Sequence, residues 1–146
     1  MQVDVTIDET CIQPKAIIFT AALTDDVRQA VEQLSRSGRR LIAGCRGETV
    51  RLLEPEELVR IYASAGKVLA SDGRETYTLR LRLYEAEAQL DPQRFVRISN
   101  SELVNLARVQ SFDLSLTGTI RVRLSDGTVT YVSRRYVSKL KKQLGL

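Results

Sequence analysis

The chain has 146 residues, 43% hydrophobic and 27% charged, which is a globular composition large enough for one domain, or one domain with a short appendage. No apolar run reaches the length of a membrane span and the first residues do not resemble a secretory signal, so we expect a cytoplasmic protein. The two cysteines lack metal-ligand spacing and there is no histidine, which excludes a zinc site and a His-dependent triad, and we expect no cofactor.

Charge is divided unevenly along the chain. Residues 1–93 hold 12 Lys and Arg against 15 Asp and Glu, whereas residues 94–146 hold 10 against 3. A basic end on an acidic body indicates an anionic partner for that end. A solvated basic helix would give the same count, and this simpler alternative stays open. The acidic body disfavours a broad contact with a membrane.

The first 38 residues are predicted to form a strand–strand–helix appendage that could serve dimerisation or regulation. Apolar and polar residues alternate from residue 2 to residue 8, and a short apolar run spans residues 16–22, so both segments are predicted strands. Thr24 is placed to cap a helix that Gly38 ends. The apolar face of this helix needs a partner, either the main domain or a second copy.

Residues 39–146 are predicted to be mainly β with short helices, an α+β class. Strand pairs are expected around Gly47, around Asp72-Gly73 and around Asp126-Gly127, the last being the clearest hairpin signal. The short helices are expected at residues 84–90 and 134–144.

The most informative stretch begins as a strand at Phe95 and ends in three small polar residues at 99–101. Ser99 followed three residues later by Glu102 fits a capping box, so a helical turn over residues 102–106 is expected. A polar tip between apolar anchors can present hydrogen-bonding side chains to a partner, although an ordinary capped turn has the same pattern.

The predicted last helix opens with two cations. Ser133 is placed to cap it, and Arg134 and Arg135 follow in the first turn, where the helix dipole disfavours positive charge. A DNA phosphate would offset that cost, and Arg reads guanine edges in two hydrogen bonds. The simpler alternative to a DNA contact is that both arginines point into solvent. Arg135, Lys139 and Lys142 share one helical face.

These features in this order resemble the LytTR family of bacterial DNA-binding domains over roughly residues 39–146. The shared marks are the aromatic-x-Arg strand at 95–97, the Ser-containing loop, Val104-Asn105, the strand pair around Asp126-Gly127 and Ser133-Arg134-Arg135-Tyr136. The resemblance implies an elongated stack of three small antiparallel sheets, whose loops and last helix enter successive major grooves. Many members have His where this chain has Ser99, so a His-based contact there is excluded. The segment before Arg39 is too short for the receiver domain that usually precedes this family's DNA-binding part.

The resemblance implies base contacts at Asn100 and Arg135, with a third near Lys67. Asn100 can donate and accept at once, as reading an adenine edge requires. Ser99 and Ser101 would bond phosphate or cap the turn. The candidate DNA-binding residues are therefore Ser99, Asn100, Ser101, Arg134, Arg135, Lys139, Lys142 and Lys67.

We therefore expect a non-enzymatic, sequence-specific transcription regulator that binds promoter repeats in double-stranded DNA as a homodimer. No P-loop or dinucleotide-binding glycine motif is present. An RNA-binding β domain and a protein-interaction module with a basic docking helix are alternatives. RNA readers need exposed aromatic side chains, whereas Phe95, Phe112, Tyr131 and Tyr136 are predicted on apolar faces. The resemblance further implies a small membrane protein that holds such short regulators inactive.

Overall fold

The computed structural model describes residues 1–36 and 41–146, and the chain divides into two compact units, Met1–Gly38 and Arg39–Leu146. In the first unit, helix α1 (Asp25–Arg36) begins directly after Thr24, whose hydroxyl donates a hydrogen bond to the Asp26 carboxylate. Its predicted end at Gly38 lies outside the described residues.

The two predicted strands of the first unit are wrong. Residues 2–8 and 16–22 are irregular chain and pair with no strand in the part that the structure describes. Apolar alternation favours an extended conformation, but a strand also needs a neighbouring backbone for its hydrogen bonds. Most of the large apolar side chains of these segments consequently remain exposed, from 65% for Ile17 to 93% for Phe19, whereas Ile18 is half-buried.

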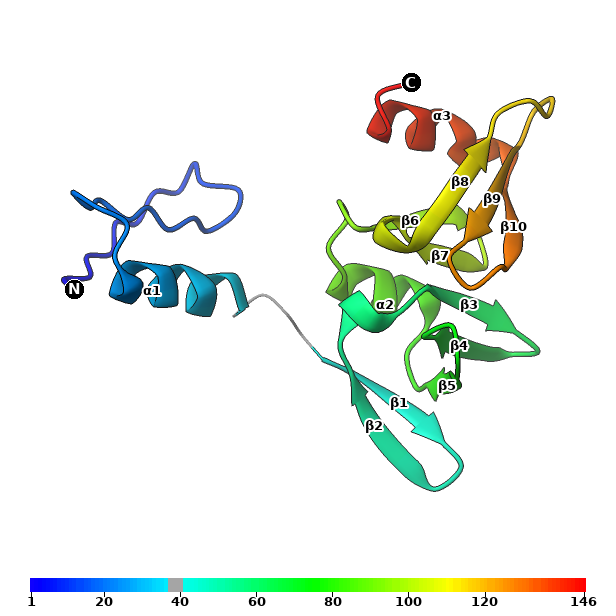
Figure 1. Ribbon diagram of the computed structural model, residues 1–146, viewed down its shortest axis with the longest axis horizontal. Coiled ribbons are helices and arrows are strands. Elements are labelled where there is room, and N and C mark those ends of the chain that lie inside the picture. The colour runs from blue at the N-terminus through cyan, green and yellow to red at the C-terminus, as the bar shows by residue number, and fades with distance from the viewer. Residues whose placement is uncertain (37–40) are drawn as a thin grey trace. The chain divides into compact units, whose positions relative to one another are not determined.

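The second unit forms two antiparallel sheets among the described residues (Figure 1), which confirms the mainly β prediction. The larger sheet has the order β2-β1-β5-β4-β3-β7-β6, and the smaller has the order β10-β9-β8. The resemblance implied three sheets, but Gly44↔Leu79 and Cys45↔Thr78 join the β1-β2 hairpin to the larger one. The elements are β1 (Ile42–Arg46), β2 (Thr49–Leu53), η1 (Pro55–Glu57), β3 (Arg60–Ser64), β4 (Lys67–Ser71), β5 (Thr76–Leu79), α2 (Leu83–Gln89), β6 (Phe95–Ser99), β7 (Glu102–Asn105), η2 (Leu106–Arg108), β8 (Val109–Asp113), β9 (Ile120–Leu124), β10 (Val129–Val132) and α3 (Arg134–Gln143).

Three predicted hairpins are present. β1 and β2 pair across Gly47, β4 and β5 across Asp72-Gly73, and β9 and β10 across Asp126-Gly127. Gly127 has a φ of 89°, a left-handed conformation that glycine adopts without the steric cost of a side chain. The Asp-Gly pair thus predicted this turn from local chemistry alone.

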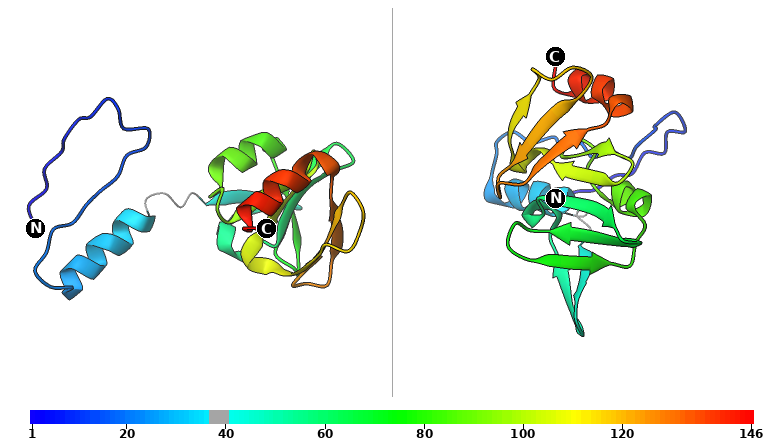
Figure 2. Two further views of the ribbon diagram at one scale, coloured as in Figure 1. Left: turned by 90° about the horizontal axis from the view of Figure 1, so that it is seen from above. Right: turned by 90° about the vertical axis from the view of Figure 1, so that its right-hand side faces the viewer.

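Strands β6 and β7 contribute to two separate apolar cores because their side chains alternate between the faces of the sheet. Phe95 and Leu103 lie in the first core, together with α2 residues such as Ala86. Val96 and Val104 lie in the second, with the three-stranded sheet and the apolar face of α3. The connection between β6 and β7, residues 99–101, is therefore anchored by both cores, and α3 packs beside β6 (Figure 2).

The predicted helical turn over residues 102–106 is wrong, because most of it is strand β7, hydrogen-bonded between β3 and β6. Glu102 does not cap a helix. Its carboxylate accepts hydrogen bonds from Arg60 Nη1 at 3.1 Å and Thr130 Oγ1 at 2.6 Å. The polar partners that make a buried Glu tolerable come from β3 and β10, which are distant in sequence and invisible to a local capping pattern.

None of the helices described is long and apolar enough to cross a membrane.

Candidate nucleic-acid interface

The turn between β6 and β7 carries Ser99, Asn100 and Ser101 on the surface. The Ser101 backbone N–H donates to Ser99 Oγ at 3.2 Å, and the two serine hydroxyl oxygens lie 3.2 Å apart. The serines therefore stabilise the turn itself, the simpler of the two roles expected for them. Their hydroxyls retain further donor and acceptor capacity for phosphate oxygens.

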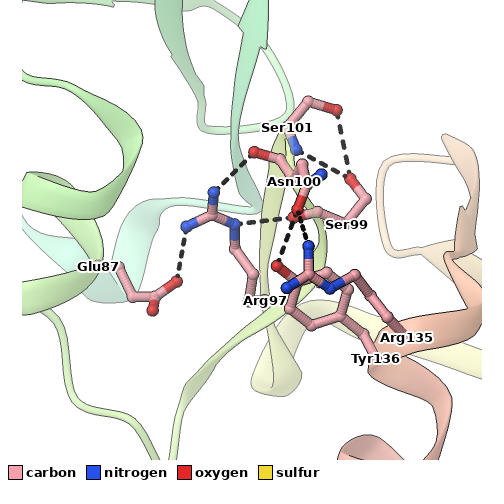
Figure 3. Close-up of polar contacts among 7 residues, drawn as sticks. All are labelled: Glu87, Arg97, Ser99, Asn100, Ser101, Arg135 and Tyr136. Carbon is pink, nitrogen blue, oxygen red and sulfur yellow. Dashed lines mark hydrogen bonds and ion pairs between the residues drawn. The ribbon is translucent and has the colours of Figure 1, made fainter.

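The side chain of Asn100 meets the first turn of α3 (Figure 3). Asn100 Oδ1 accepts a hydrogen bond from the Tyr136 hydroxyl at 3.1 Å and a longer one from Arg135 Nη1 at 3.4 Å. The Arg135 guanidinium also lies 5.6 Å from the centre of the Tyr136 ring, within reach of a cation–π contact. Two candidate residues separated by 35 positions are thus brought into contact on the surface.

This contact changes the hydrogen-bonding character expected for Asn100. Its oxygen already accepts from two donors, whereas its Nδ2 has no hydrogen-bond partner among the described residues. An adenine edge requires an acceptor and a donor on the same side chain. In this arrangement Asn100 instead presents N–H donors, as Arg135 does.

Backbone contacts and packing, rather than a serine cap, fix the start of α3. The Ser133 N–H donates to the Ile98 carbonyl at 2.8 Å, and Leu140 is buried in the second core. Ser133 occupies the predicted N-cap position, but its hydroxyl is buried and finds no partner in the described part of the chain. The helix boundary was predicted correctly and the capping hydrogen bond was not.

Arg134 lies beside the β8–β9 connection, although it is adjacent to Arg135 in the sequence. The Arg134 Nε lies 3.3 Å from the position that a Cβ atom would occupy if Gly118 had a side chain. The guanidinium therefore covers the β8–β9 connection. The side chain is exposed. Arg134 and Arg135 thus extend the basic surface in two directions from the start of α3.

The lysine candidates lie at two places. Lys139 and Lys142 are exposed on α3 and form no ion pair within residues 41–146. Lys67 is exposed at the tip of the β3–β4 hairpin, where Ala65 and Gly66 both have positive φ. Because the Ala63 N–H donates to the Ser101 carbonyl at 2.8 Å, this tip adjoins the β6–β7 turn.

A further cation of the basic end is already paired. Arg121 Nη2 lies 2.6 Å from Asp113 Oδ2, and both side chains are partly exposed. The pKa of Asp113 is held below its ordinary value, mainly because Ser115 donates hydrogen bonds to the carboxylate. The positive charge of Arg121 lowers this pKa further. Asp113 therefore stays ionised at neutral pH and offsets the Arg121 charge.

The comparisons with known proteins cover most of the second unit. The family profile of the LytTr DNA-binding domain matches residues 48–145. The chain belongs to the LytTR family.

Named relatives of this LytTR chain and one solved structure agree with that assignment. An uncharacterized HTH-type transcriptional regulator of Staphylococcus aureus strain NCTC 8325 is 33% identical over 132 residues, 88% of each chain. A second, from strain MSSA476, is 34% identical over 117 residues, which are 80% of this chain and 78% of that one. A solved LytTr DNA-binding domain from Bacillus cereus has the same fold, with a TM-score of 0.71 at 20% identity, over 74% of this chain and 99% of that one.

Three residues of the surface were not predicted. Tyr136 was expected only on an apolar face, whereas its hydroxyl reaches Asn100. Arg97 was expected as part of the aromatic-x-Arg strand, and Glu87 only within a helix, yet the two are joined at 3.0 Å beside the turn (Figure 3). One signal was available, because an arginine on the same strand face as buried Phe95 requires acceptors nearby.

Proposed function

We propose that this LytTR chain is a DNA-binding transcription regulator that recognises a particular DNA sequence through Asn100 and Arg135. The observation that carries the proposal is their contact on the exposed surface, in which the turn between β6 and β7 and the first turn of α3 form one patch. The family match supplies the DNA partner. The patch supplies side chains of the kind that read base edges.

The patch offers hydrogen-bond donors to the major groove. Arg135 has five N–H groups in a planar fork, and Asn100 contributes the two donors of Nδ2 while its oxygen is occupied. The acceptors in the groove are N7 and O6 of guanine, N7 of adenine and O4 of thymine. We therefore assign Arg135 to a guanine and Asn100 to a neighbouring acceptor, in place of the two-bond contact with adenine.

The remaining candidates serve to hold phosphate. Lys139, Lys142 and Arg134 extend from the patch along α3 and toward the β8–β9 connection, and Lys67 stands on the hairpin tip beside the turn. Lys and Arg side chains that contact phosphates instead of base edges set the register of a protein on the duplex, and the affinity that they contribute is independent of sequence.

We further propose that the regulator acts in the cytoplasm as a homodimer, through its N-terminal unit. Val3, Val5 and Ile7 are 78–89% exposed, and Val31 of α1 is 45% exposed. Apolar surface of this extent is a feature of interaction sites, and a second copy of the unit is the occupant we propose. A small membrane protein that holds the regulator inactive is a further proposed partner, on the family resemblance alone.

Selection of bound sequences from a random duplex pool tests the function. A regulator should enrich one motif, and binding should fall when that motif is scrambled; equal binding to every sequence would contradict the proposal.

Single-stranded RNA serves as a competitor that tests the RNA-binding alternative. Tyr131, predicted on an apolar face, is in fact 53% exposed because it lies on the outer side of edge strand β10, so one obstacle to RNA stacking is removed. RNA that displaces the selected duplex at equal concentration would favour the RNA alternative.

A further inference from the structure

Besides the Ser99 hydroxyl, the side chain of Arg97 on β6 holds the backbone of the β6–β7 turn, and it does so at two points (Figure 3). Arg97 Nε donates to the Ser99 carbonyl at 2.7 Å, and Nη2 donates to the Asn100 carbonyl at 2.6 Å. Its Nη1 donates to Glu87 Oε2 at 3.0 Å. The guanidinium therefore makes three directed hydrogen bonds, and its side chain is only 17% exposed.

We propose that Arg97 is a positioning residue that sets the orientation of Asn100 for DNA recognition, and that Glu87 of α2 holds Arg97 in place. This inference rests on the proposed function, because it takes Asn100 to be a DNA contact. We do not assign Arg97 itself to a base, since three of its five N–H groups are donated to the protein's own carbonyl and carboxylate oxygens and its side chain is largely buried.

The turn needs such a side chain because the β6–β7 ladder is interrupted there. The register shifts between Arg97 and Ser99, and the pairing then closes with Ser99 opposite Glu102. The Asn100 carbonyl lies in the turn beyond the last strand pair, and Arg97 donates both to it and to the Ser99 carbonyl beside the register shift. Hydrogen bonds from a charged donor are about twice as strong as neutral ones, and the planar fork fixes two neighbouring carbonyls at once.

Asn100 is consequently held from two directions. Arg97 binds its backbone carbonyl from the side of the first core, whereas Tyr136 and Arg135 bind its side-chain oxygen from α3. Holding both ends removes part of the entropy that a mobile loop would lose when it docks on DNA. Positioning of this kind should affect recognition of a particular sequence more than general attraction to the duplex.

Glu87 completes the arrangement from a rigid element. Helix α2 buries Leu83 and Ala86 in the first core, which fixes the direction in which Glu87 extends toward Arg97. The Glu87 side chain is 44% exposed, so water weakens the ion pair. Loss of Glu87 should therefore have a smaller effect than loss of the arginine fork.

Three variants test the inference: Arg97→Lys, Arg97→Gln and Glu87→Gln. Lysine keeps the positive charge but cannot bind two carbonyls and a carboxylate in one plane, so it separates geometry from charge. Arg94→Lys is the matched control, because Arg94 lies three positions before Arg97, pairs with Glu56 at 3.5 Å, and makes no hydrogen bond to the turn among the described residues. Asn100→Ala is included as the reference for loss of the proposed base contact.

Two readouts are needed, and the first does not involve DNA. Hydrogen exchange measured by NMR on the full chain should accelerate about tenfold at the Ser101 N–H in Arg97→Lys and more in Arg97→Gln, while the Arg94→Lys chain exchanges as the parent does. The second readout is affinity for the selected duplex and for a scrambled one. Arg97→Lys should lose about tenfold on the selected duplex and less than about twofold on the scrambled one.

The salt dependence separates positioning from direct phosphate contact. A positioning residue leaves the slope of log affinity against log salt unchanged, whereas loss of one phosphate contact makes it shallower by about 0.9. Unchanged exchange at the turn, or a shallower slope in Arg97→Lys, would overturn the inference. The inference would also be overturned if Arg97→Lys exchanged faster at the turn but kept full affinity for the selected duplex, while Asn100→Ala still weakened binding to that duplex. If Asn100→Ala itself has no selective effect, the proposed DNA contact fails first, and the positioning role falls with it.

Discussion

Asn100 is contacted by two arginines whose roles differ. Arg97 binds its backbone carbonyl at 2.6 Å and belongs to the scaffold, whereas Arg135 approaches its side-chain oxygen at 3.4 Å from an exposed position. The longer contact is the weaker one and costs little to exchange for a base edge. The Tyr136 hydroxyl can keep its hydrogen bond to Asn100 during that exchange.

Base-reading residues should be distinguishable from phosphate-binding residues by mutation. Asn100→Ala and Arg135→Ala should each cost about 1–3 kcal/mol of binding free energy on the selected duplex and much less on unrelated DNA. Lys142→Ala should weaken both complexes by nearly the same factor and make the salt slope shallower by about one. The measurement is the affinity of each variant for the selected and the scrambled duplex.

Circular dichroism is the folding control for this set, because all three side chains are exposed and their loss should leave the fold intact. Equal losses on both duplexes for Asn100→Ala and Lys142→Ala would show that Asn100 is not a base reader, even if the protein still binds DNA.

Glu102 should be a stability residue and not a DNA contact. It is 7% exposed and joins Arg60 of β3 to Thr130 of β10. Glu102→Ala leaves a partly buried guanidinium without its carboxylate, so the free energy of unfolding should fall by about 2–3 kcal/mol. Urea denaturation measures it, with Thr130→Val as the milder comparison at about 1 kcal/mol. An unchanged unfolding midpoint for Glu102→Ala would show that the network contributes nothing net.

At the scale of elements, α3 is positioned by its apolar face and by its two ends. Val137 and Leu140 pack into the second core, the Ser133 N–H bonds to β6, and Gln143 Nε2 donates to the Pro92 carbonyl at 2.9 Å. The face opposite these contacts carries Lys139 and Lys142. Packing therefore decides which side of the helix is available to DNA.

Ser133→Ala should be neutral or stabilising, in contrast to the usual loss of about 1 kcal/mol when a serine N-cap is removed. The reason is that the Ser133 hydroxyl is buried and without a partner among the residues described, so its removal ends a desolvation penalty. Thermal unfolding of the full chain checks this, with Ser138→Ala, at an exposed position of the same helix, as the comparison. A drop in stability of about 1 kcal/mol would show that the hydroxyl does cap the helix.

At the scale of the whole molecule, the uneven charge has a direct consequence for binding. Five of the ten cations of the basic end lie on α3, and one of these, Arg134, covers the β8–β9 connection. Asp113 already offsets Arg121, and Lys67 at the β3–β4 tip adds a cation from outside the basic end. The solvated basic helix remains the alternative, and salt dependence tells the two apart.

DNA affinity should fall steeply with salt. If about four cations per subunit engage phosphate, log affinity against log salt should have a slope near −3.6 per subunit. The variant Asp113→Asn should keep or steepen this slope, because it releases the Arg121 charge. Titration of one duplex at several salt concentrations gives the value, and a slope near zero would mean that the basic helix is simply solvated.

The proposed homodimer should protect two half-sites on one face of the duplex, about one helical turn apart. Two linked modules raise affinity because the second binds at a high effective concentration. Footprinting on the selected duplex gives the spacing. Replacing Val5 and Ile7 by serine should leave the affinity for a single half-site unchanged while abolishing the gain from the second. A monomer that binds one half-site at full affinity would contradict the dimer.

The sequence by itself determined the features that depend on local chemistry. Asp126-Gly127 predicted a hairpin because glycine adopts positive φ at little cost, and the helix predicted at residues 134–144 is present as α3. The family resemblance pointed to Asn100 and Arg135, and residues 48–145 match the family. No local sequence pattern predicted which residues of the protein Asn100 contacts.

Only the tertiary structure decided how these residues act. The capping pattern at Ser99 and Glu102 was locally sound, but Glu102 obtains its partners from β3 and β10, and the pairing of β7 on both sides outweighs one helical turn. Arg97 and Glu87 meet only because the fold brings β6 and α2 together at the first core. Backbone pairing and charge satisfaction are settled between segments distant in sequence, so a local pattern lists the possible partners of a side chain without choosing among them.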